Sequence, residues 1–126
     1  MGAKVEVSLE SKIAHLFAAF ARKDIAEILS YFEPTAVYHK IPMARFEGHE
    51  QIAETLQEFF VDGLTVEFHI MNIAIRNNQV MVERVTRVTH DGLVRDIPIM
   101  GIFEFSSDLR ICAWRDYFDR GQAGIA

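Results

Sequence analysis

The sequence contains little cysteine and fewer basic than acidic side chains. Cys112 is the only cysteine, so no internal disulfide can form, which is typical of a reducing, cytoplasmic location. Acidic residues outnumber basic ones by 18 to 13, and the net charge of −5 argues against a nucleic-acid-binding protein. No apolar run reaches the roughly 18 residues of a membrane helix, and no His and Cys residues stand at ligand spacing. We therefore expect neither nucleic acid nor membrane as a partner, and neither a metal nor a cofactor.

Apolar side chains are plentiful instead. Half of the 126 residues are hydrophobic and 10 residues are phenylalanine, which is enough for one sizeable core. Neither an internal repeat nor a low-complexity linker divides the sequence. We expect a single domain over residues 1–126.

The first half of the sequence has the apolar periodicity of helices. We predict a first helix with Ser8 as its N-cap. Its buried face has helical spacing and consists of Ile13, Leu16, Phe17 and Phe20. Asp24 and Glu27 have the spacing of a capping box, which predicts a short second helix. A third helix is predicted over residues 49–61, ended by Gly63, and its buried face consists of Ile52, Leu56, Phe59 and Phe60.

From Leu64 onward the apolar pattern alternates, as in half-buried strands. The predicted strands span residues 64–75, 79–90, 93–105 and 109–119, after a short β-prone segment at residues 36–40. Asp91-Gly92 is a strong signal for a two-residue hairpin. Helices followed by an antiparallel meander indicate the α+β class, with a curved, mainly antiparallel sheet wrapped over three helices.

A carboxylate stands on an apolar face near the end of the chain. Side chains two residues apart in a strand share a face. The face of this carboxylate is predicted to consist of Cys112, Trp114, Asp116 and Phe118. Burying a carboxylate there is costly unless it is paired or hydrogen-bonded. Asp116 is therefore either a member of a structural ion pair, with Arg84 or Lys40, or a functional carboxylate of an active site.

The neighbouring strands supply the other inward faces. The strand over residues 93–105 has an almost wholly apolar face, which consists of Ile97, Ile99, Gly101, Phe103 and Phe105. The pattern of residues 79–90 does not decide whether the face of Arg84 or the opposite face points inward. Tyr38 and Lys40 share one face of the short segment before the third helix.

Four segments resemble the limonene epoxide hydrolase family. They are Val37-Tyr38-His39-Lys40-Ile41-Pro42, Val82-Glu83-Arg84-Val85, Ile99-Met100-Gly101-Ile102-Phe103 and Trp114-Arg115-Asp116-Tyr117-Phe118-Asp119. The last segment is the most specific, and the resemblance covers nearly the whole chain. It implies the cone-shaped fold of the nuclear-transport-factor-like superfamily, which ketosteroid isomerases, scytalone dehydratase and small polyketide cyclases share.

In that family an Asp–Arg–Asp triad hydrates an epoxide in one step. The resemblance implies that Asp116 is the general base, that Arg84 bridges the two carboxylates, and that Tyr38 helps to hold the attacking water. It also places Arg84 on the inward face of its strand. The implied function is that of a small-molecule enzyme acting on a largely apolar substrate.

Two positions depart from the family pattern. The second triad Asp falls at Thr86, and the Asn that holds the water falls at Lys40. A threonine hydroxyl is far too weak an acid to protonate an epoxide oxygen, and general acid catalysis contributes ~10²–10⁴-fold. We therefore expect poor turnover of limonene-type epoxides. The expected substrate-contacting residues are Lys40, Thr86, Ile97, Ile99, Trp114 and Phe118.

Other interpretations stay open. Proton transfer on a carbonyl compound needs one carboxylate base and no second acid, and a non-catalytic small-ligand-binding protein needs neither. Arg84 also fits a structural partner of Asp116, and Tyr38 fits a core aromatic. Lys40 either reaches the mouth of the pocket or enters it, where desolvation makes it a candidate acid, base or amine nucleophile.

The opposite face of the sheet predicts a homodimer. Its apolar centre is interleaved with charged side chains, which suits a protein partner better than water. Its apolar members are Met81, Val85, Met100, Ile102 and Tyr117, and its charged members are Glu83, Arg87, Glu104 and Arg115.

Overall fold

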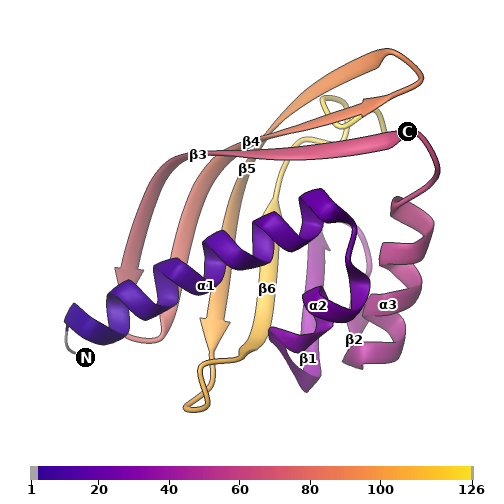
Figure 1. Cartoon of the computed structure of the whole chain (residues 1–126). Coiled ribbons are helices and arrows are strands. Elements are labelled where there is room, and N and C mark those ends of the chain that lie inside the picture. The colour runs from indigo at the N-terminus through magenta and orange to yellow at the C-terminus, as the bar shows by residue number, and fades with distance from the viewer. Residues whose placement is uncertain (1–2, 126) are drawn as a thin grey trace.

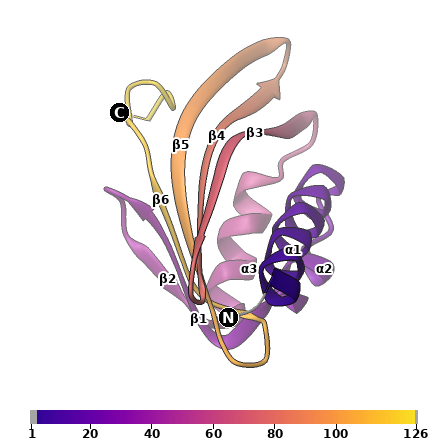
Figure 2. The same cartoon turned by 90° about the vertical axis from the view of Figure 1, so that its left-hand side faces the viewer.

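Three helices lie on the concave side of a strongly curved sheet, as Figures 1 and 2 show. The computed structural model describes residues 3–125, apart from the side chains of residues 3 and 5–7. The helices are α1 (Ala3–Arg22), α2 (Ile25–Ser30) and α3 (Gly48–Phe59). The strands are β1 (Phe32–Ile41), β2 (Arg45–Glu47), β3 (Leu64–Arg76), β4 (Gln79–His90), β5 (Leu93–Phe105) and β6 (Ile111–Tyr117). The predicted α+β class and its three helices are confirmed.

The order of the strands brings distant parts of the sequence together. The sheet has the order β2-β1-β6-β5-β4-β3, and all neighbours are antiparallel except β1 and β6, which run parallel. Strand β6 therefore lies between β1 and β5. Asp116 is paired in register with Lys40 on one side and with Gly101 on the other.

The buried stripe of helix α1 begins one turn earlier than the sequence predicts. The predicted members Ile13, Leu16, Phe17 and Phe20 are buried, and so is Leu9. Leu9 stands four residues before Ile13, so it extends the stripe toward the N-terminus. Because helix α1 begins at Ala3, Ser8 lies inside it, and the predicted role of Ser8 as N-cap is wrong.

The ends of α2 and α3 agree with the prediction in part. The Asp24 carboxylate accepts a hydrogen bond from the backbone N–H of Glu27 at 3.0 Å, as predicted. The Glu27 side chain pairs with Arg22, so the capping box is only half formed. Helix α3 ends at Phe59, and Gly63 lies beyond it in the turn to β3, where its φ of +81° favours glycine.

The long hairpin strands follow the prediction closely, whereas β1 and β2 do not. Strands β4 and β5 have the predicted bounds, and Asp91 and Gly92 between them both have positive φ, as a tight hairpin turn requires. Strand β1 begins at Phe32 and contains Pro34, at a point where its pairing with β6 is irregular. A proline is tolerated in a strand at such an irregularity. The three residues of β2 are too few to show an alternating pattern.

A bulge in β6 reverses one predicted orientation. Ile111 is buried, whereas Cys112, predicted to face inward, is half-buried and donates its thiol hydrogen to the backbone carbonyl of Glu104. The pairing with β5 shifts by one residue at this point, and one extra residue inverts the alternation of the strand. Trp114 and Asp116, which follow the bulge, face inward as predicted.

Trp114 lies at the centre of the core between α1 and the sheet. Its ring contacts those of Phe20, Phe32, Tyr38 and Phe103, at centroid distances of 4.5–6.1 Å. Contacts on several sides leave a buried indole little freedom to rotate. The ring N–H of Trp114 is therefore held in one direction, toward Asp116.

Candidate functional site

A cavity of about 290 Å³ lies between the concave face of the sheet and helices α1 and α3. Its apolar wall includes Phe20, Leu56, Phe59, Val66, Phe68, Ile97 and Ile99. Its polar side chains are Tyr38, Lys40, Arg84, Thr86, Arg95 and Asp116. An apolar cavity with a few converging polar groups is the usual form of a small-molecule site.

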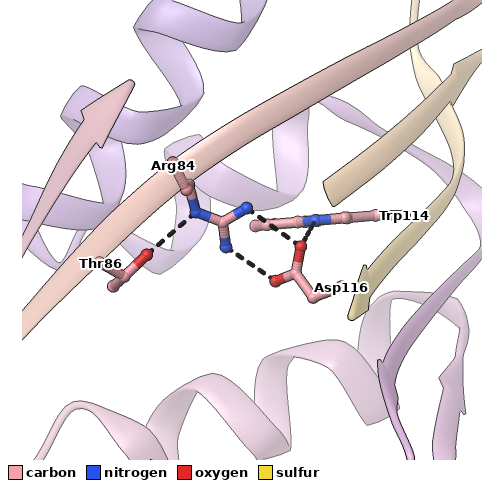
Figure 3. Close-up of polar contacts among 4 residues, drawn as sticks. All are labelled: Arg84, Thr86, Trp114 and Asp116. Carbon is pink, nitrogen blue, oxygen red and sulfur yellow. Dashed lines mark hydrogen bonds and ion pairs between the residues drawn. The ribbon is translucent and has the colours of Figure 1, made fainter. Parts of the chain in front are cut away.

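Asp116 and Arg84 form a bidentate ion pair in the cavity wall (Figure 3). Nη1 of Arg84 donates to Oδ1 of Asp116 at 3.1 Å, and Nη2 donates to Oδ2 at 2.8 Å. Arg84 reaches the carboxylate from β4 across β5, because the intervening residue of β5 is Gly101. A Cβ on Gly101 would lie 2.8 Å from both Nη1 and Oδ1, so only glycine leaves room for the pair.

Trp114 supplies a third donor to the carboxylate. Its Nε1–H donates to Oδ1 of Asp116 at 2.7 Å (Figure 3). A carboxylate has about four acceptor positions, so three donors leave roughly one unused. Oδ1 accepts two of these bonds and Oδ2 one, which leaves Oδ2 as the atom available to a water or a substrate hydrogen.

Aromatic rings enclose the Arg84 guanidinium. Its Cζ lies 5.4 Å, 5.2 Å and 5.9 Å from the ring centroids of Phe17, Phe68 and Trp114. Its Nε donates to the hydroxyl of Thr86 at 3.0 Å. In Figure 3 Thr86 and the carboxylate lie on different sides of the guanidinium. The Thr86 hydroxyl and the Asp116 carboxylate thus both bind the same guanidinium.

Tyr38 faces the cavity from β1. Its ring stacks on that of Trp114 at a centroid distance of 4.5 Å. Burial, together with the nearby carboxylate of Asp116, raises the pKa of the Tyr38 phenol. The phenol is therefore a hydrogen-bonding group, and a weak acid.

Lys40 also lines the cavity, which the sequence leaves open. Its Nζ lies 5.5 Å from the ring centroids of both Tyr38 and Phe59. Burial lowers the pKa of the Lys40 amine, and the charges of Asp116 and Glu58 oppose that shift. The amine is therefore a mostly desolvated group on which the charges of the Asp116 and Glu58 carboxylates act.

All the predicted site residues line this cavity, and their roles remain predictions. They are Asp116, Arg84, Tyr38, Lys40, Thr86, Ile97, Ile99, Trp114 and Phe118. The structure adds Arg95, whose guanidinium packs against Gly124 in the C-terminal turn. Arg95 stands two residues before Ile97, so the alternation of the strand was a usable signal for it. Gly101 gave no such signal, because its role depends on distances to groups of other strands.

The family model of the limonene-1,2-epoxide hydrolase catalytic domain matches residues 9–122. An LEH-like epoxide hydrolase from M. tuberculosis is 23% identical, over 92% of this chain and 86% of that one, with a TM-score of 0.81. A structure described as a SnoaL-like polyketide cyclase, from Shewanella denitrificans, is 16% identical, over 92% of this chain and 93% of that one, with a TM-score of 0.80. A protein of unknown function from Cytophaga hutchinsonii, similar to nuclear transport factor 2, is 13% identical, over 92% and 94%, with a TM-score of 0.72. These structural similarities establish the shared fold.

Proposed function

This chain belongs to the limonene-1,2-epoxide hydrolase catalytic domain family, and we propose that it is an enzyme whose general base is Asp116. One observation carries the proposal: a carboxylate that is only 3% exposed lies in the wall of an apolar cavity, where the described residues supply three donors for its about four acceptor positions. Arg84 and Trp114 hold this carboxylate in one orientation. The apolar walls suit a small, largely apolar substrate.

Proton transfer at a carbon next to a carbonyl group is the reaction that fits the geometry best. Such a reaction needs one base and a group that stabilises negative charge on oxygen. The family resemblance aligns the second acid of the triad with Thr86, whose hydroxyl accepts a hydrogen bond from Arg84. A hydroxyl in that position does not supply a proton at neutral pH. A structure of the same fold is described as a SnoaL-like polyketide cyclase, and polyketides are carbonyl compounds.

Epoxide hydration is the second candidate function. The family that the chain belongs to is named for this reaction, and the ion pair of Asp116 with Arg84 is present. Asp116 would then take a proton from a water molecule. Another group than Thr86 would have to protonate the oxygen of the opened ring.

Isotope labelling distinguishes the two reactions. Small enolisable ketones are incubated with the protein in D₂O, and 1,2-epoxides of the same size in H₂¹⁸O. Deuterium at the carbon next to the carbonyl identifies proton transfer, and ¹⁸O in a diol identifies hydration. Asp116→Asn should abolish whichever reaction occurs, while Asp96→Asn, which removes an exposed carboxylate on the same sheet, should leave it unchanged. The proposal would be contradicted if wild type introduced neither label, or if Asp116→Asn introduced as much label as wild type.

The outer face of the sheet supports a second proposal, that the protein is a homodimer. Met100 and Tyr117 on this face are each 43% exposed, which is high for side chains of this size. A second copy of the same face would cover them. Sedimentation equilibrium at micromolar concentration should give a dimer for wild type and a monomer for Met100→Lys. A monomeric wild-type protein would contradict the proposed homodimer.

The location of the protein is also a proposal. A single half-buried cysteine, Cys112, suits the reducing cytoplasm. Among the described residues, no helix is both long enough and apolar enough to cross a membrane.

A further inference from the structure

The Lys40 amine lies in the cavity wall without a direct ion pair to any described carboxylate, although the charges of Asp116 and Glu58 act on it from a greater distance. None of the carboxylates among the described side chains forms an ion pair with it. Its neighbours are instead the ring faces of Tyr38 and Phe59, each 5.5 Å from Nζ. Ring faces attract a cation, but they do not replace the hydrogen bonds that the amine would make in water.

The described side chains that line the cavity carry a net positive charge, although the protein carries a net charge of −5. Asp116 and Arg84 neutralise one another in a bidentate pair. The remaining charged side chains in the wall are Lys40 and Arg95, both basic. A positive, largely apolar cavity favours a substrate on which negative charge exists or develops during the reaction.

The positions of Lys40 and Asp116 in the sheet indicate which substrate geometry the two groups can serve. The two residues are register partners on neighbouring parallel strands, and both line the cavity. Neighbouring strands lie about 4.7–4.9 Å apart, so the two side chains leave the sheet from adjacent positions and reach the same cavity from one wall. In an enolisable carbonyl compound, the acidic C–H and the oxygen stand side by side, on adjacent carbon atoms. In the opening of an epoxide, water attacks from the side opposite the departing oxygen, so the base and the acid must face one another across the substrate.

We propose that Lys40 is a catalytic residue that binds the carbonyl oxygen of a small, largely apolar ketone while Asp116 removes a proton from the adjacent carbon. This proposal rests on the proposed function and narrows its substrate class. The C–H bond breaks, its electron pair forms the C=C bond of an enolate, and the C=O π electrons move to the oxygen beside the Lys40 ammonium. Asp116 then returns the proton to a carbon of the enolate, so no oxidant or other co-reactant is needed.

The first test is the rate of deuterium incorporation into small ketones in D₂O, followed by NMR. Lys40→Met keeps the length of the side chain and removes its charge, and should lower the rate by about 10²–10³-fold, as the loss of one oxyanion donor does. Lys40→Arg, which retains the charge, should recover part of the rate. Lys12→Met is the matched control, because Lys12 of α1 does not line the cavity, and it should behave as wild type. Thermal melting and circular dichroism check that each variant is folded.

A binding measurement tests the same proposal without turnover. 2-Naphthol is an apolar phenol whose absorption spectrum distinguishes the phenol from the phenolate, and the phenolate oxygen resembles that of an enolate. Wild type should bind 2-naphthol with a larger phenolate fraction than Lys40→Met does. Equal phenolate fractions, or a Lys40→Met exchange rate within about threefold of wild type, would overturn the role of Lys40.

The outcomes separate this proposal from the one it rests on. Loss of exchange in Asp116→Asn with an unchanged rate in Lys40→Met overturns the role of Lys40 alone. An unchanged rate in Asp116→Asn overturns Asp116 as the base. Diol formation from epoxides, without exchange in any ketone, overturns the carbonyl substrate and leaves Asp116 as the base of a hydration.

Discussion

Strand β4 contributes two Arg–Asp pairs of nearly the same geometry in opposite environments. Arg84 holds Asp116 with bonds of 2.8 Å and 3.1 Å, and Arg87 holds Asp96 with bonds of 2.7 Å and 3.0 Å. The side chains of the first pair are 2% and 5% exposed, and those of the second are 46% and 47% exposed. Geometry alone therefore does not distinguish the candidate site from a surface ion pair.

The surroundings make the difference. The inner pair, Arg84 with Asp116, has a third donor in Trp114, aromatic rings around its guanidinium and a cavity beside its carboxylate. The outer pair, Arg87 with Asp96, is exposed to water, which screens both charges and can replace either partner. A variant of the inner pair should therefore have a large effect, and the matched variant of the outer pair a small one.

Removing the guanidinium should have the largest effect on stability. Arg84→Met leaves the Asp116 carboxylate buried with Trp114 as its remaining donor among the described residues. Breaking one side of a buried pair lowers the free energy of unfolding by about 3–5 kcal/mol. Urea unfolding should show this loss, and Arg87→Met should stay close to wild type. Equal effects of the two variants would remove the distinction between the pairs.

Adding a second carboxylate to the inner pair should change the reaction. Thr86→Asp places a carboxyl group beside Nε of Arg84, where the hydroxyl now accepts a hydrogen bond. If the rest of the site is intact, hydration of limonene-type epoxides should rise by about 10²-fold or more, the usual contribution of a general acid. Thr89→Asp on the other face of β4 is the control. Rapid hydration by the native sequence would show that another group already supplies the proton.

Replacing Gly101, over which the inner pair crosses β5, should have a smaller effect on stability than removing the guanidinium. The Cβ of Gly101→Ala would lie 2.8 Å from both Nη1 of Arg84 and Oδ1 of Asp116, so the pair must move. Overpacking of this kind costs about 1–3 kcal/mol of stability. At Gly121 the added Cβ meets only the exposed side chain of Asp119, which can move, so Gly121→Ala is the control. A melting temperature of Gly101→Ala equal to that of wild type would contradict the tight fit.

The outer pair should stabilise the protein slightly at neutral pH and not at all in acid. The hydrogen bond from Arg87 lowers the pKa of Asp96. A carboxyl with a lowered folded-state pKa stabilises the folded state above its unfolded pKa of about 4, and this contribution is lost as the pH falls further. Asp96→Asn should therefore lower the melting temperature slightly at pH 7 and leave it unchanged near pH 2, with a smaller difference in 1 M salt. The same difference at both pH values would contradict this assignment.

Alternation and turn chemistry predict the fold well where they operate without interruption. Strands β4 and β5 have the predicted bounds because Asp91-Gly92 fixes their hairpin and its register. The prediction is wrong at Cys112, because one extra residue in β6 inverts the alternation before Trp114 restores it. It is also wrong at Ser8, because helix α1 already begins at Ala3.

The sequence predicts which residues form the candidate site better than it predicts how they are arranged. The resemblance and the period of two place Tyr38, Arg84, Thr86 and Asp116 on inward faces, and the structure brings them to one cavity. The orientation of Lys40 and the need for glycine at position 101 depend on contacts between strands that lie far apart in the sequence. A single sequence contains no local signal for such contacts.

The most direct test of the account compares Asp116→Asn with Asp96→Asn. Both variants replace a carboxylate by an amide of nearly the same shape, one in the inner pair and one in the outer pair. The rate of deuterium exchange, or of diol formation if that is the reaction found, should fall by at least about 10²-fold in Asp116→Asn. It should equal that of wild type in Asp96→Asn. An Asp116→Asn protein that melts like wild type and still turns over substrate would contradict both the catalytic and the structural role of Asp116.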